Sequence, residues 1–154
     1  MLRPPEAADA DAWRHLYRQY CEFYRVNFSD ELANTVWGWL HDADHVLEGL
    51  LAVRAGQVVG LAHFRETPEP LAGAHGGFLD DLFVDPEVRG QGIGRALIAD
   101  IVAKAKSRNW VGVQWLTADD NYPARRSYDQ LATRTMWLTY EAHMTEQSSQ
   151  KLAD

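Results

Sequence analysis

The sequence predicts a single α/β domain, and three observations favour this fold class. The chain has 154 residues, of which 46% are hydrophobic and 24% charged, so it is long enough for one hydrophobic core and short for two. Segments whose apolar residues follow a helical period alternate with short strand-like runs. No internal repeat occurs. We predict the element order βααβββαβαβ in one domain over residues 1–144, with a disordered polar tail at 145–154.

Two helices are predicted near the N-terminus. Between Ala8 and Arg25, apolar and aromatic residues recur every three or four positions, which is the period of a helix with one buried face. A second helix, from about Asp30 to Leu40, follows Ser29, a residue type that caps helix N-termini. The aromatic members of the first helix are expected to lie mainly in the core, and they are Trp13, Tyr17, Tyr20 and Tyr24.

A hairpin and a third strand are predicted next. Residues 48–55 and 58–66 are strand-like runs joined by the dipeptide "GQ", which suits a tight turn. The stretch at 67–77 is rich in Pro and Gly, so we expect a loop there. The run "FLDDLFVDP" at 78–86 predicts the third strand of the group.

Four elements complete the predicted order. Residues 93–108 have helical spacing, and residues 111–118 read as a strand. A short helix is expected to begin near Asn121, with Pro123 in its first turn. The segment 135–144 alternates apolar and polar residues, which predicts a half-buried strand that pairs within the sheet or across a dimer.

Composition excludes several classes of function. The net charge of −7 argues against sequence-independent binding of nucleic acid, which requires a field that attracts phosphates. No run of about 18 apolar residues occurs, so we expect no membrane span, and the first residues lack a secretion signal. The single cysteine, Cys21, fits a cytoplasmic location. His41 and His45 have no evident third ligand, so we expect no metal site.

Three glycines occupy the junction of the third strand and the following helix, in "VRGQGIG" at residues 88–94. The dinucleotide fingerprint G-x-G-x-x-G is not met, because Arg95 stands where the last glycine is required. A P-loop is also excluded, because no G-K-[ST] follows. Backbone N–H groups at the start of a helix can bind a diphosphate. A tight turn with no ligand remains the alternative interpretation.

Two carboxylates interrupt the apolar strand before these glycines. Strand alternation places Asp80 with Phe78 and Leu82, and Asp81 on the opposite face. A buried carboxylate requires a partner or a function. One interpretation is that Asp80 or Asp81 receives an ammonium group and takes its proton, directly or through water. The other is that one of them pairs with a core arginine such as Arg65.

The segment Arg89 to Gly94 matches [RQ]-x-x-G-x-[GA], a motif of the GNAT superfamily, the Gcn5-related N-acetyltransferases, and the run "FLDDLFVDPEVRGQGIGRAL" resembles the strand, loop and helix of that family. Downstream, Asn121, Ala124 and Tyr128 are spaced as in the family's second motif. Together the two motifs and the element order over about residues 1–144 resemble a GNAT fold, a central mixed, mostly antiparallel twisted sheet flanked by helices. The sequence is most similar to the small polyamine and histone acetyltransferase branch.

The resemblance implies that acetyl-CoA is the donor and that its diphosphate lies on the N–H groups between Arg89 and Gly94. It also implies a slot for the pantetheine arm beside the strand that ends near Val84, where a backbone N–H near Leu82 or Phe83 binds the thioester carbonyl. Arg125 and Arg126 are candidates for the remaining phosphate, with an exposed helix face as the alternative. The residues implicated in binding acetyl-CoA are Leu82, Phe83, Val84, Arg89, Gly90, Gln91, Gly92, Ile93, Gly94, Arg95, Asn121, Ala124 and Arg125.

The same resemblance assigns the acid and the acceptor site. Tyr128 corresponds to the family tyrosine that protonates the leaving thiolate, with a core tyrosine as the alternative. Asp80, Glu22 and Tyr24 are expected to line the acceptor site, and Asp80, Asp81 or a water chain is expected to act as base. The predicted activity is acetyl transfer from acetyl-CoA to a small cationic amine by direct attack in a ternary complex, in a cytoplasmic homodimer. The alternatives are acetylation of a protein N-terminus or lysine, and a noncatalytic acyl-CoA sensor.

Overall fold

The computed structural model describes residues 1–142. The chain forms two units, one from Met1 to Asn121 and one that begins at Tyr122, and the structure defines each of them separately. The first unit contains β1 (Leu2–Arg3), α1 (Ala10–Phe23), α2 (Asp30–His41), β2 (Leu47–Arg54), β3 (Gln57–Glu69), β4 (Ala74–Val84), α3 (Ile93–Ser107) and β5 (Val113–Trp115), with short 3-10 helices at Ala7–Asp9 and Pro86–Val88. The second contains α4 (Tyr122–Tyr128).

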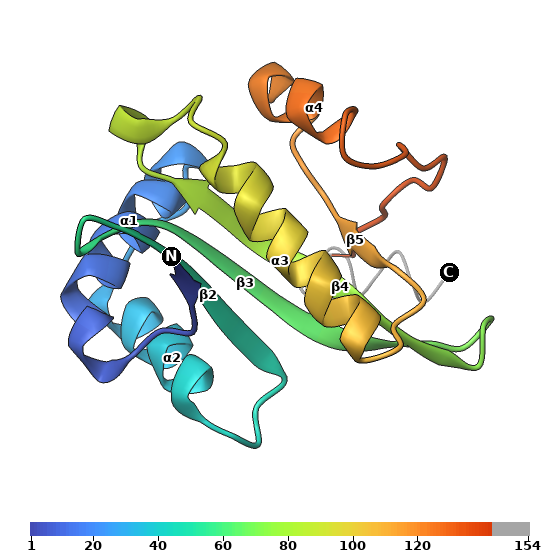
Figure 1. Ribbon diagram of the computed structural model, residues 1–154, viewed down its shortest axis with the longest axis horizontal. Helices are drawn as coiled ribbons and strands as arrows, with labels where there is room; N and C mark the ends of the chain where they lie inside the picture. The colour runs from blue at the N-terminus through green and yellow to red at the C-terminus, as the bar shows by residue number, and fades with distance from the viewer. Residues whose placement is uncertain (143–154) are drawn as a thin grey trace. The chain divides into compact units, whose positions relative to one another are not determined.

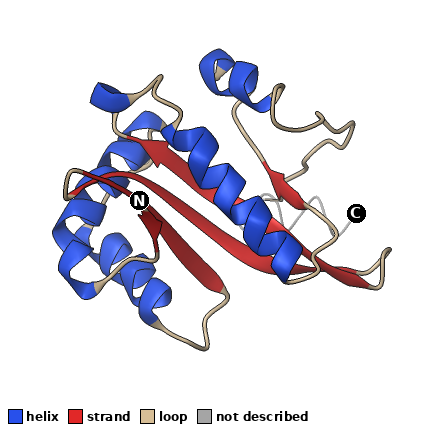
Figure 2. Cartoon of the chain, viewed as in Figure 1, coloured by secondary structure: helices blue, strands red, loops and turns tan. Residues whose placement is uncertain are grey.

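The five strands of the first unit form one sheet in the order β1-β2-β3-β4-β5. The first three pairings are antiparallel, whereas β5 runs parallel to β4. Figure 1 shows α3 in front of this sheet with α1 and α2 behind it, and Figure 2 shows the same helices in blue against the strands in red. Alternation along β3 agrees with this picture, because a Cβ on Gly60 would lie 3.3 Å from the Ile93 side chain of α3, whereas Leu61 packs in the cluster beneath α1. The predicted mixed, mostly antiparallel sheet is confirmed.

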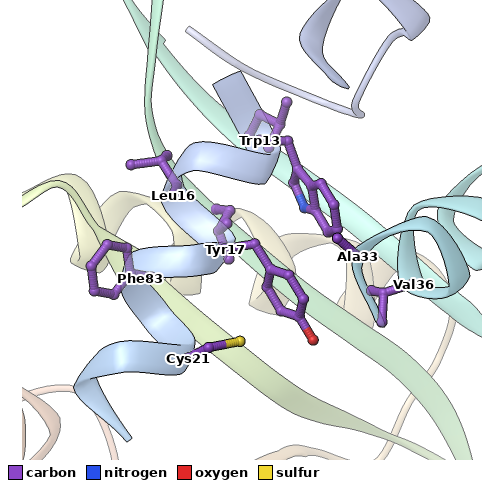
Figure 3. Close-up of a cluster of buried hydrophobic side chains, with 9 residues drawn as sticks. Trp13, Leu16, Tyr17, Cys21, Ala33, Val36 and Phe83 are labelled. Atoms are coloured by element: carbon purple, nitrogen blue, oxygen red, sulfur yellow. The ribbon is translucent and has the colours of Figure 1, made fainter. Parts of the chain in front are cut away.

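The main hydrophobic cluster lies between the sheet and the helices α1 and α2 (Figure 3). Trp13 is fully buried at its centre and stacks on Tyr17 with 4.8 Å between ring centroids. Phe83 of β4 closes the cluster from the sheet side. Burial of each large side chain contributes about 1.5–3 kcal/mol, so this cluster fixes α1 firmly over β3 and β4.

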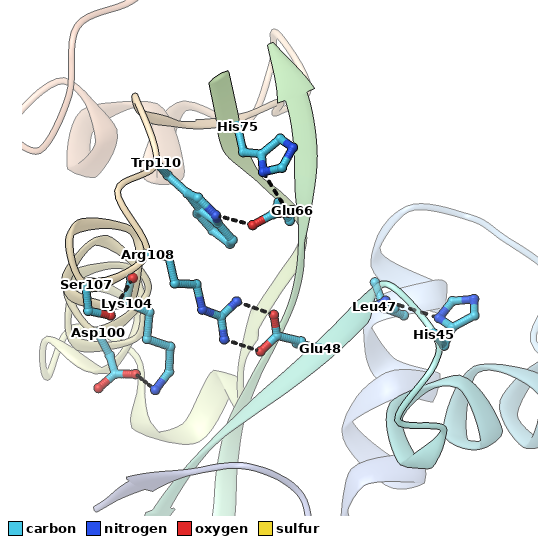
Figure 4. Close-up of polar contacts among 10 residues, drawn as sticks. All are labelled: His45, Leu47, Glu48, Glu66, His75, Asp100, Lys104, Ser107, Arg108 and Trp110. Atoms are coloured by element: carbon cyan, nitrogen blue, oxygen red, sulfur yellow. Dashed lines mark hydrogen bonds and ion pairs between the residues drawn. The ribbon is translucent and has the colours of Figure 1, made fainter. Parts of the chain in front are cut away.

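A second group of contacts fixes the C-terminal end of α3 (Figure 4). The Arg108 guanidinium forms a two-pronged ion pair with Glu48 of β2, with 2.8 Å between Nη2 and Oε2. The Trp110 indole Nε1 donates to Glu66 of β3 at 2.6 Å. These contacts hold the helix along the sheet, and its N-terminal end lies over the end of β4, where a Cβ on Gly94 would be 3.7 Å from Val84.

The hairpins differ in detail from the prediction. The turn between β2 and β3 is formed by Ala55 and Gly56, one residue earlier than expected, and both have positive φ, 49° and 79°. Positive φ at both central positions matches the twist of a hairpin. The loop expected at 67–77 is limited to residues 70–73, because Thr67 to Glu69 and Ala74 to Gly77 pair as the continuation of β3 and β4. Ladder pairing with a neighbour overrides the local preference of Pro and Gly for loops there.

The strand expected at 135–144 is also not observed where the structure describes it. Residues 133–142 have no regular secondary structure, and large apolar side chains among them are exposed, Met136 by 95% and Tyr140 by 89%. An alternating pattern forms a strand only when a neighbouring backbone accepts its hydrogen bonds. Residues 143 and 144 and the tail at 145–154 lie outside the described residues. The strand expected at 111–118 is likewise shorter, Val113–Trp115.

Candidate active site

The glycine turn, residues Arg89 to Gly94, connects β4 to α3 through the 3-10 helix at Pro86–Val88. Gly90 and Gly92 have φ of 77° and 79°, a conformation that residues with a Cβ adopt at a cost of about 1–2 kcal/mol. A Cβ at either position would meet no atom within 4 Å, so the backbone is open on that side. Gly92 is the N-cap of α3, and no side chain caps the helix there. The first turn of a helix carries N–H groups without partners inside the helix. The turn therefore fits a diphosphate group.

Contacts with the neighbouring strands hold this turn in place. Arg89 Nε donates to the Val84 carbonyl at 2.9 Å, and its guanidinium lies 5.1 Å from the centroid of the Phe83 ring. Gln91 accepts a hydrogen bond from Arg54, at the end of β2. Arg54 adds positive charge beside the turn, and sequence reasoning missed it because its contact with Gln91 spans 37 residues.

Among residues 1–142, the C-terminal part of β4 has no parallel partner strand. Pairing with β5 covers Gly77 to Leu79 and ends there, although β4 continues to Val84. Within the described residues no strand pairs with Asp80 to Val84 on this side. The backbone of this stretch, which includes Leu82 and Phe83, thus forms an open edge that leads to the glycine turn. The slot for the pantetheine arm that was expected beside Val84 stays a prediction.

A β-bulge lies at the start of this open edge. His63 of β3 is opposite Asp81, and the next residue, Phe64, is opposite Leu79, so Asp80 is the extra residue of β4. A bulge leaves one residue out of the ladder and bends the strand. The two carboxylates have different partners, as alternation along the strand predicts, whereas the bulge that leaves Asp80 out of the ladder was not predicted.

Asp80 pairs with Arg65 of β3. Arg65 Nε lies 3.1 and 3.0 Å from the two carboxylate oxygens, and its guanidinium lies over the Phe78 ring at 5.1 Å. Burial raises the pKa of Asp80 above its usual value, even though Arg65 acts in the opposite direction. Of the two interpretations of these carboxylates, the pairing with Arg65 is observed for Asp80, whose side chain is still 25% exposed.

Asp81 accepts hydrogen bonds from two donors, His63 and Tyr20. His63 Nδ1 lies 2.8 Å from Asp81 Oδ2, and the Tyr20 hydroxyl hydrogen-bonds the same carboxylate. Burial favours the neutral acid, but hydrogen bonding and electrostatic interaction with His63, together with the hydrogen bond from Tyr20, outweigh it and hold the pKa of Asp81 below its usual value. Burial and the charge of Asp81 raise the pKa of Tyr20 in turn, so the phenol keeps its proton. Of the two aspartates, Asp81 thus has its ionised form the more strongly favoured.

His63 and Tyr20 were not predicted as site residues. The signal for His63 was a histidine inside an otherwise apolar strand, and Tyr20 belonged to the aromatic stripe that was assigned mainly to the core. Of the two expected acceptor-site residues on α1, Tyr24 packs its ring against Tyr20 at 5.1 Å and is 39% exposed. Glu22 lies on the exposed side of the helix end.

The remaining predicted residues lie on or beside α4. The Asn121 side-chain amide donates to Thr117 Oγ1 at 3.3 Å. Ala124, Arg125 and Tyr128 belong to α4, in the second unit, and the Arg125 guanidinium lies 5.8 Å from the centroid of the Tyr122 ring. Their roles toward acetyl-CoA stay predictions.

The expected surface histidines are engaged in local contacts. His41 Nδ1 lies 3.0 Å from the Trp37 carbonyl, and His45 Nδ1 accepts from the Leu47 N–H at 3.1 Å. Among residues 1–142 there is no group of three or more His, Cys, Asp or Glu side chains placed to bind a metal ion. In the same part of the chain, none of the helices has the length and apolar character that a membrane span requires.

The sequence model of the acetyltransferase (GNAT) family matches residues 13–132. The chain belongs to this family. It is 28% identical over 143 residues to the D-amino-acid N-acetyltransferase HPA3 of Saccharomyces cerevisiae, a match that covers 92% of this chain and 89% of that protein. The GNAT resemblance predicted from the two motifs is thereby confirmed.

Two solved structures share the fold of this GNAT protein. The ribosomal-protein-alanine N-acetyltransferase of Brucella melitensis biovar Abortus 2308 has a TM-score of 0.79 and 26% identity, covering 94% of this chain and 98% of that one. The aminoglycoside N-acetyltransferase AAC(6')-Iy, solved in complex with CoA, has a TM-score of 0.80 and 18% identity, covering 94% of this chain and 95% of that one. The chain is an N-acetyltransferase that acts on amines, and enzymes of its family use acetyl-CoA as donor.

Proposed function

We propose that the protein transfers the acetyl group of acetyl-CoA to the primary amine of a small cationic or amino-acid-like molecule, by direct attack in a ternary complex. One observation carries this proposal. Two aspartates with opposite pKa shifts, Asp80 and Asp81, lie at the bulge where β4 becomes an open edge leading to the glycine turn.

The residues of the turn would hold the donor by its diphosphate. The N–H groups of Gly90 to Gly94 supply donors at the positive end of α3, and Arg89 and Arg54 add charge beside them. Acetyl-CoA supplies the acetyl group as a reactive thioester. The open edge of β4 near Leu82 and Phe83 would place a backbone N–H where it can stabilise negative charge on the acetyl oxygen.

The two aspartates would divide the work on the acceptor. Asp81, held ionised, attracts the ammonium form of the amine and orients it. Asp80 has a raised pKa and partial exposure, so it is better suited to take up the proton, directly or through water. Tyr128 is proposed as the acid that protonates the leaving thiolate, on the strength of the family motif alone.

The relatives favour a small acceptor. HPA3, the relative with 28% identity over nearly the whole chain, is a D-amino-acid N-acetyltransferase. A negatively charged site at Asp81 suits the ammonium group that amino acids and polyamines share. The similarity to a ribosomal-protein-alanine N-acetyltransferase favours a second candidate, acetylation of a protein N-terminus at alanine.

An acceptor screen tests the proposal by measuring the release of CoA thiol. The panel contains D- and L-amino acids, polyamines, an aminoglycoside and a peptide with an N-terminal alanine, with and without the protein. Saturable turnover with a small amine and none with the peptide is the expected result. Turnover with the peptide alone would replace the small acceptor with a protein N-terminus, and binding of acetyl-CoA without thiol release from any acceptor would show a noncatalytic sensor.

Two asparagine variants test the division between the carboxylates. Asp80→Asn is expected to lower kcat at least about tenfold with little change in the KM of the amine, because it removes the proton acceptor. Asp81→Asn is expected to raise the KM of the amine at least about tenfold. The same kinetic change in both variants would contradict separate roles.

The homodimer and the cytoplasmic location stay predictions from the sequence.

A further inference from the structure

His63 is the most deeply buried ionisable residue among the described ones, with 1% exposure. Asp9 is also buried among the described residues, and Arg3 neutralises it through hydrogen bonds of 2.6 and 2.9 Å near the N-terminus. His63 has no cationic or anionic partner except Asp81, and it lies on β3 beneath α1. Burying an imidazole carries a cost unless both of its nitrogens find partners.

Both nitrogens of His63 do find partners, and these partners fix the position of the ring proton. Trp13 Nε1 lies 3.0 Å from His63 Nε2, and His63 Nδ1 lies 2.8 Å from Asp81 Oδ2. An indole N–H can only donate, so Nε2 must accept. The ring proton is therefore on Nδ1 and is donated to Asp81. A second proton on Nε2 would face the Trp13 N–H.

The same contacts fix the carboxylate. Trp13 is fully buried and packed between Tyr17 and Trp37, so it holds the imidazole rigidly. Asp81 receives one hydrogen bond from His63 and one from Tyr20. A carboxylate has about four acceptor positions. With 23% of its side chain exposed, Asp81 keeps acceptor capacity for a further hydrogen bond.

We propose that His63 is a positioning residue of the acceptor site, whose Nδ1–H holds the Asp81 carboxylate in the orientation that receives the amine of the acceptor. This role rests on the proposed function, because it needs an amine to be received. It adds to that function a buried residue, His63, which contacts Trp13 on one side and Asp81 on the other. His63 itself need not touch the substrate.

Several ionisable groups besides His63 face Asp81 and shape its charge. Tyr17, Tyr20 and Cys21 face it from α1, and burial together with the charge of Asp81 raises the pKa of all three, so they stay neutral. Arg65, on β3, is paired with Asp80, the neighbour of Asp81 on β4. Removal of the His63 donor leaves burial as the main influence on Asp81, which moves its pKa upward.

Two variants of His63 separate positioning from mere packing. The amide nitrogen of His63→Asn occupies the place of Nδ1 and can still donate to Asp81. The amide of His63→Gln reaches the place of Nε2 and keeps the contact with Trp13 instead. Both replace the ring with a smaller polar side chain, so their packing defects are similar, and thermal unfolding confirms that each is folded before kinetics are measured.

The kinetic experiment measures kcat/KM for the best acceptor of the screen between about pH 5 and 9. His63→Asn is expected to keep the KM of the amine within about threefold of the parent enzyme. His63→Gln is expected to raise it at least about tenfold, to shift the acid limb of the profile to higher pH, and to leave the KM of acetyl-CoA within about twofold. Equal kinetics in the two variants, or parallel changes in both KM values, would overturn the positioning role.

A measurement independent of activity separates this inference from the proposed function. In protein labelled with nitrogen-15 at histidine, correlation spectra identify which ring nitrogen of His63 carries the proton, and Nδ1 is expected. A proton on Nε2 in an active enzyme would overturn the positioning role alone. A folded enzyme that acetylates no acceptor would instead overturn the proposed function, and the positioning role with it.

Discussion

Replacing Gly90 with alanine tests whether the glycine turn binds a ligand or is merely a tight turn. Gly90 has φ of 77°, and a Cβ added there would meet no atom of the protein within 4 Å. The matched control is Gly56→Ala in the β2–β3 turn, where φ is 79° and the space is equally open. The two substitutions carry the same backbone strain, about 1–2 kcal/mol, so each is expected to lower the melting temperature by about 2–8 °C.

The two variants should differ only in their affinity for acetyl-CoA. A methyl group at Gly90 enters the space through which a diphosphate approaches the amides of the turn, and one charge-assisted hydrogen bond is worth about 1.5–3 kcal/mol. Its loss corresponds to an increase in Kd of about 10- to 100-fold. Gly56→Ala is expected to keep the parent Kd.

Titration calorimetry with acetyl-CoA, at a temperature where both variants are folded, provides the measurement. The reasoning would be refuted if Gly90→Ala lost as much stability as Gly56→Ala and yet bound acetyl-CoA within about twofold of the parent protein, because the turn would then be a structural feature with no ligand.

Three further outcomes are expected. Gly77→Ala should lower the free energy of unfolding in urea by about 1–3 kcal/mol, because its Cβ would lie 2.4 Å from the buried Trp110 ring. The control is Gly76→Ala, whose Cβ meets only the flexible Glu69 side chain, so it should lower the free energy of unfolding by less. The pKa of Asp81 is lowered in the folded state, so its ionised form stabilises the fold above the pKa of the unfolded state. Asp81→Asn should therefore lower the free energy of unfolding at neutral pH, but not at pH values below the pKa of the folded state. Urea unfolding measured as a function of pH tests this. Tyr128→Phe should lower kcat at least about tenfold with little change in acetyl-CoA affinity, and unchanged turnover would remove Tyr128 from the mechanism.

The features that sequence predicted well are local ones. The helical period of α1, the cap at Ser29, whose hydroxyl accepts from the Leu32 N–H at 3.0 Å, and the glycines of the turn each depend on residues close in the chain. The order of elements up to α4 follows from the same local patterns.

The features that sequence did not predict depend on partners distant in the chain. At the bulge, β4 has one more residue than β3, because Asp80 has no partner in the ladder. The residue pattern of β4 alone does not show where its register with β3 shifts. The contact between Trp13 and His63 spans 50 residues, so a histidine in an apolar strand could be noted but not assigned. The segment at 135–142 was predicted as a strand but is not one. Its alternation suits a strand, but no strand among the described residues pairs with it.

Under the proposed function, the opposite pKa shifts of the adjacent Asp80 and Asp81 would resolve a conflict inherent in acetylating an amine. A lysine-like amine has a pKa near 10.4, so deprotonation at neutral pH costs about 4–5 kcal/mol. An ionised carboxylate that attracts the ammonium raises this cost, because it stabilises the protonated form. A single carboxylate would therefore hold the proton as firmly as it holds the substrate. His63 and Tyr20 hydrogen-bond Asp81 and help to hold its pKa below the usual value, whereas burial raises the pKa of Asp80, whose side chain is partly exposed. Attraction and deprotonation can then be assigned to different groups, which is why the partners of each carboxylate matter as much as the carboxylates themselves.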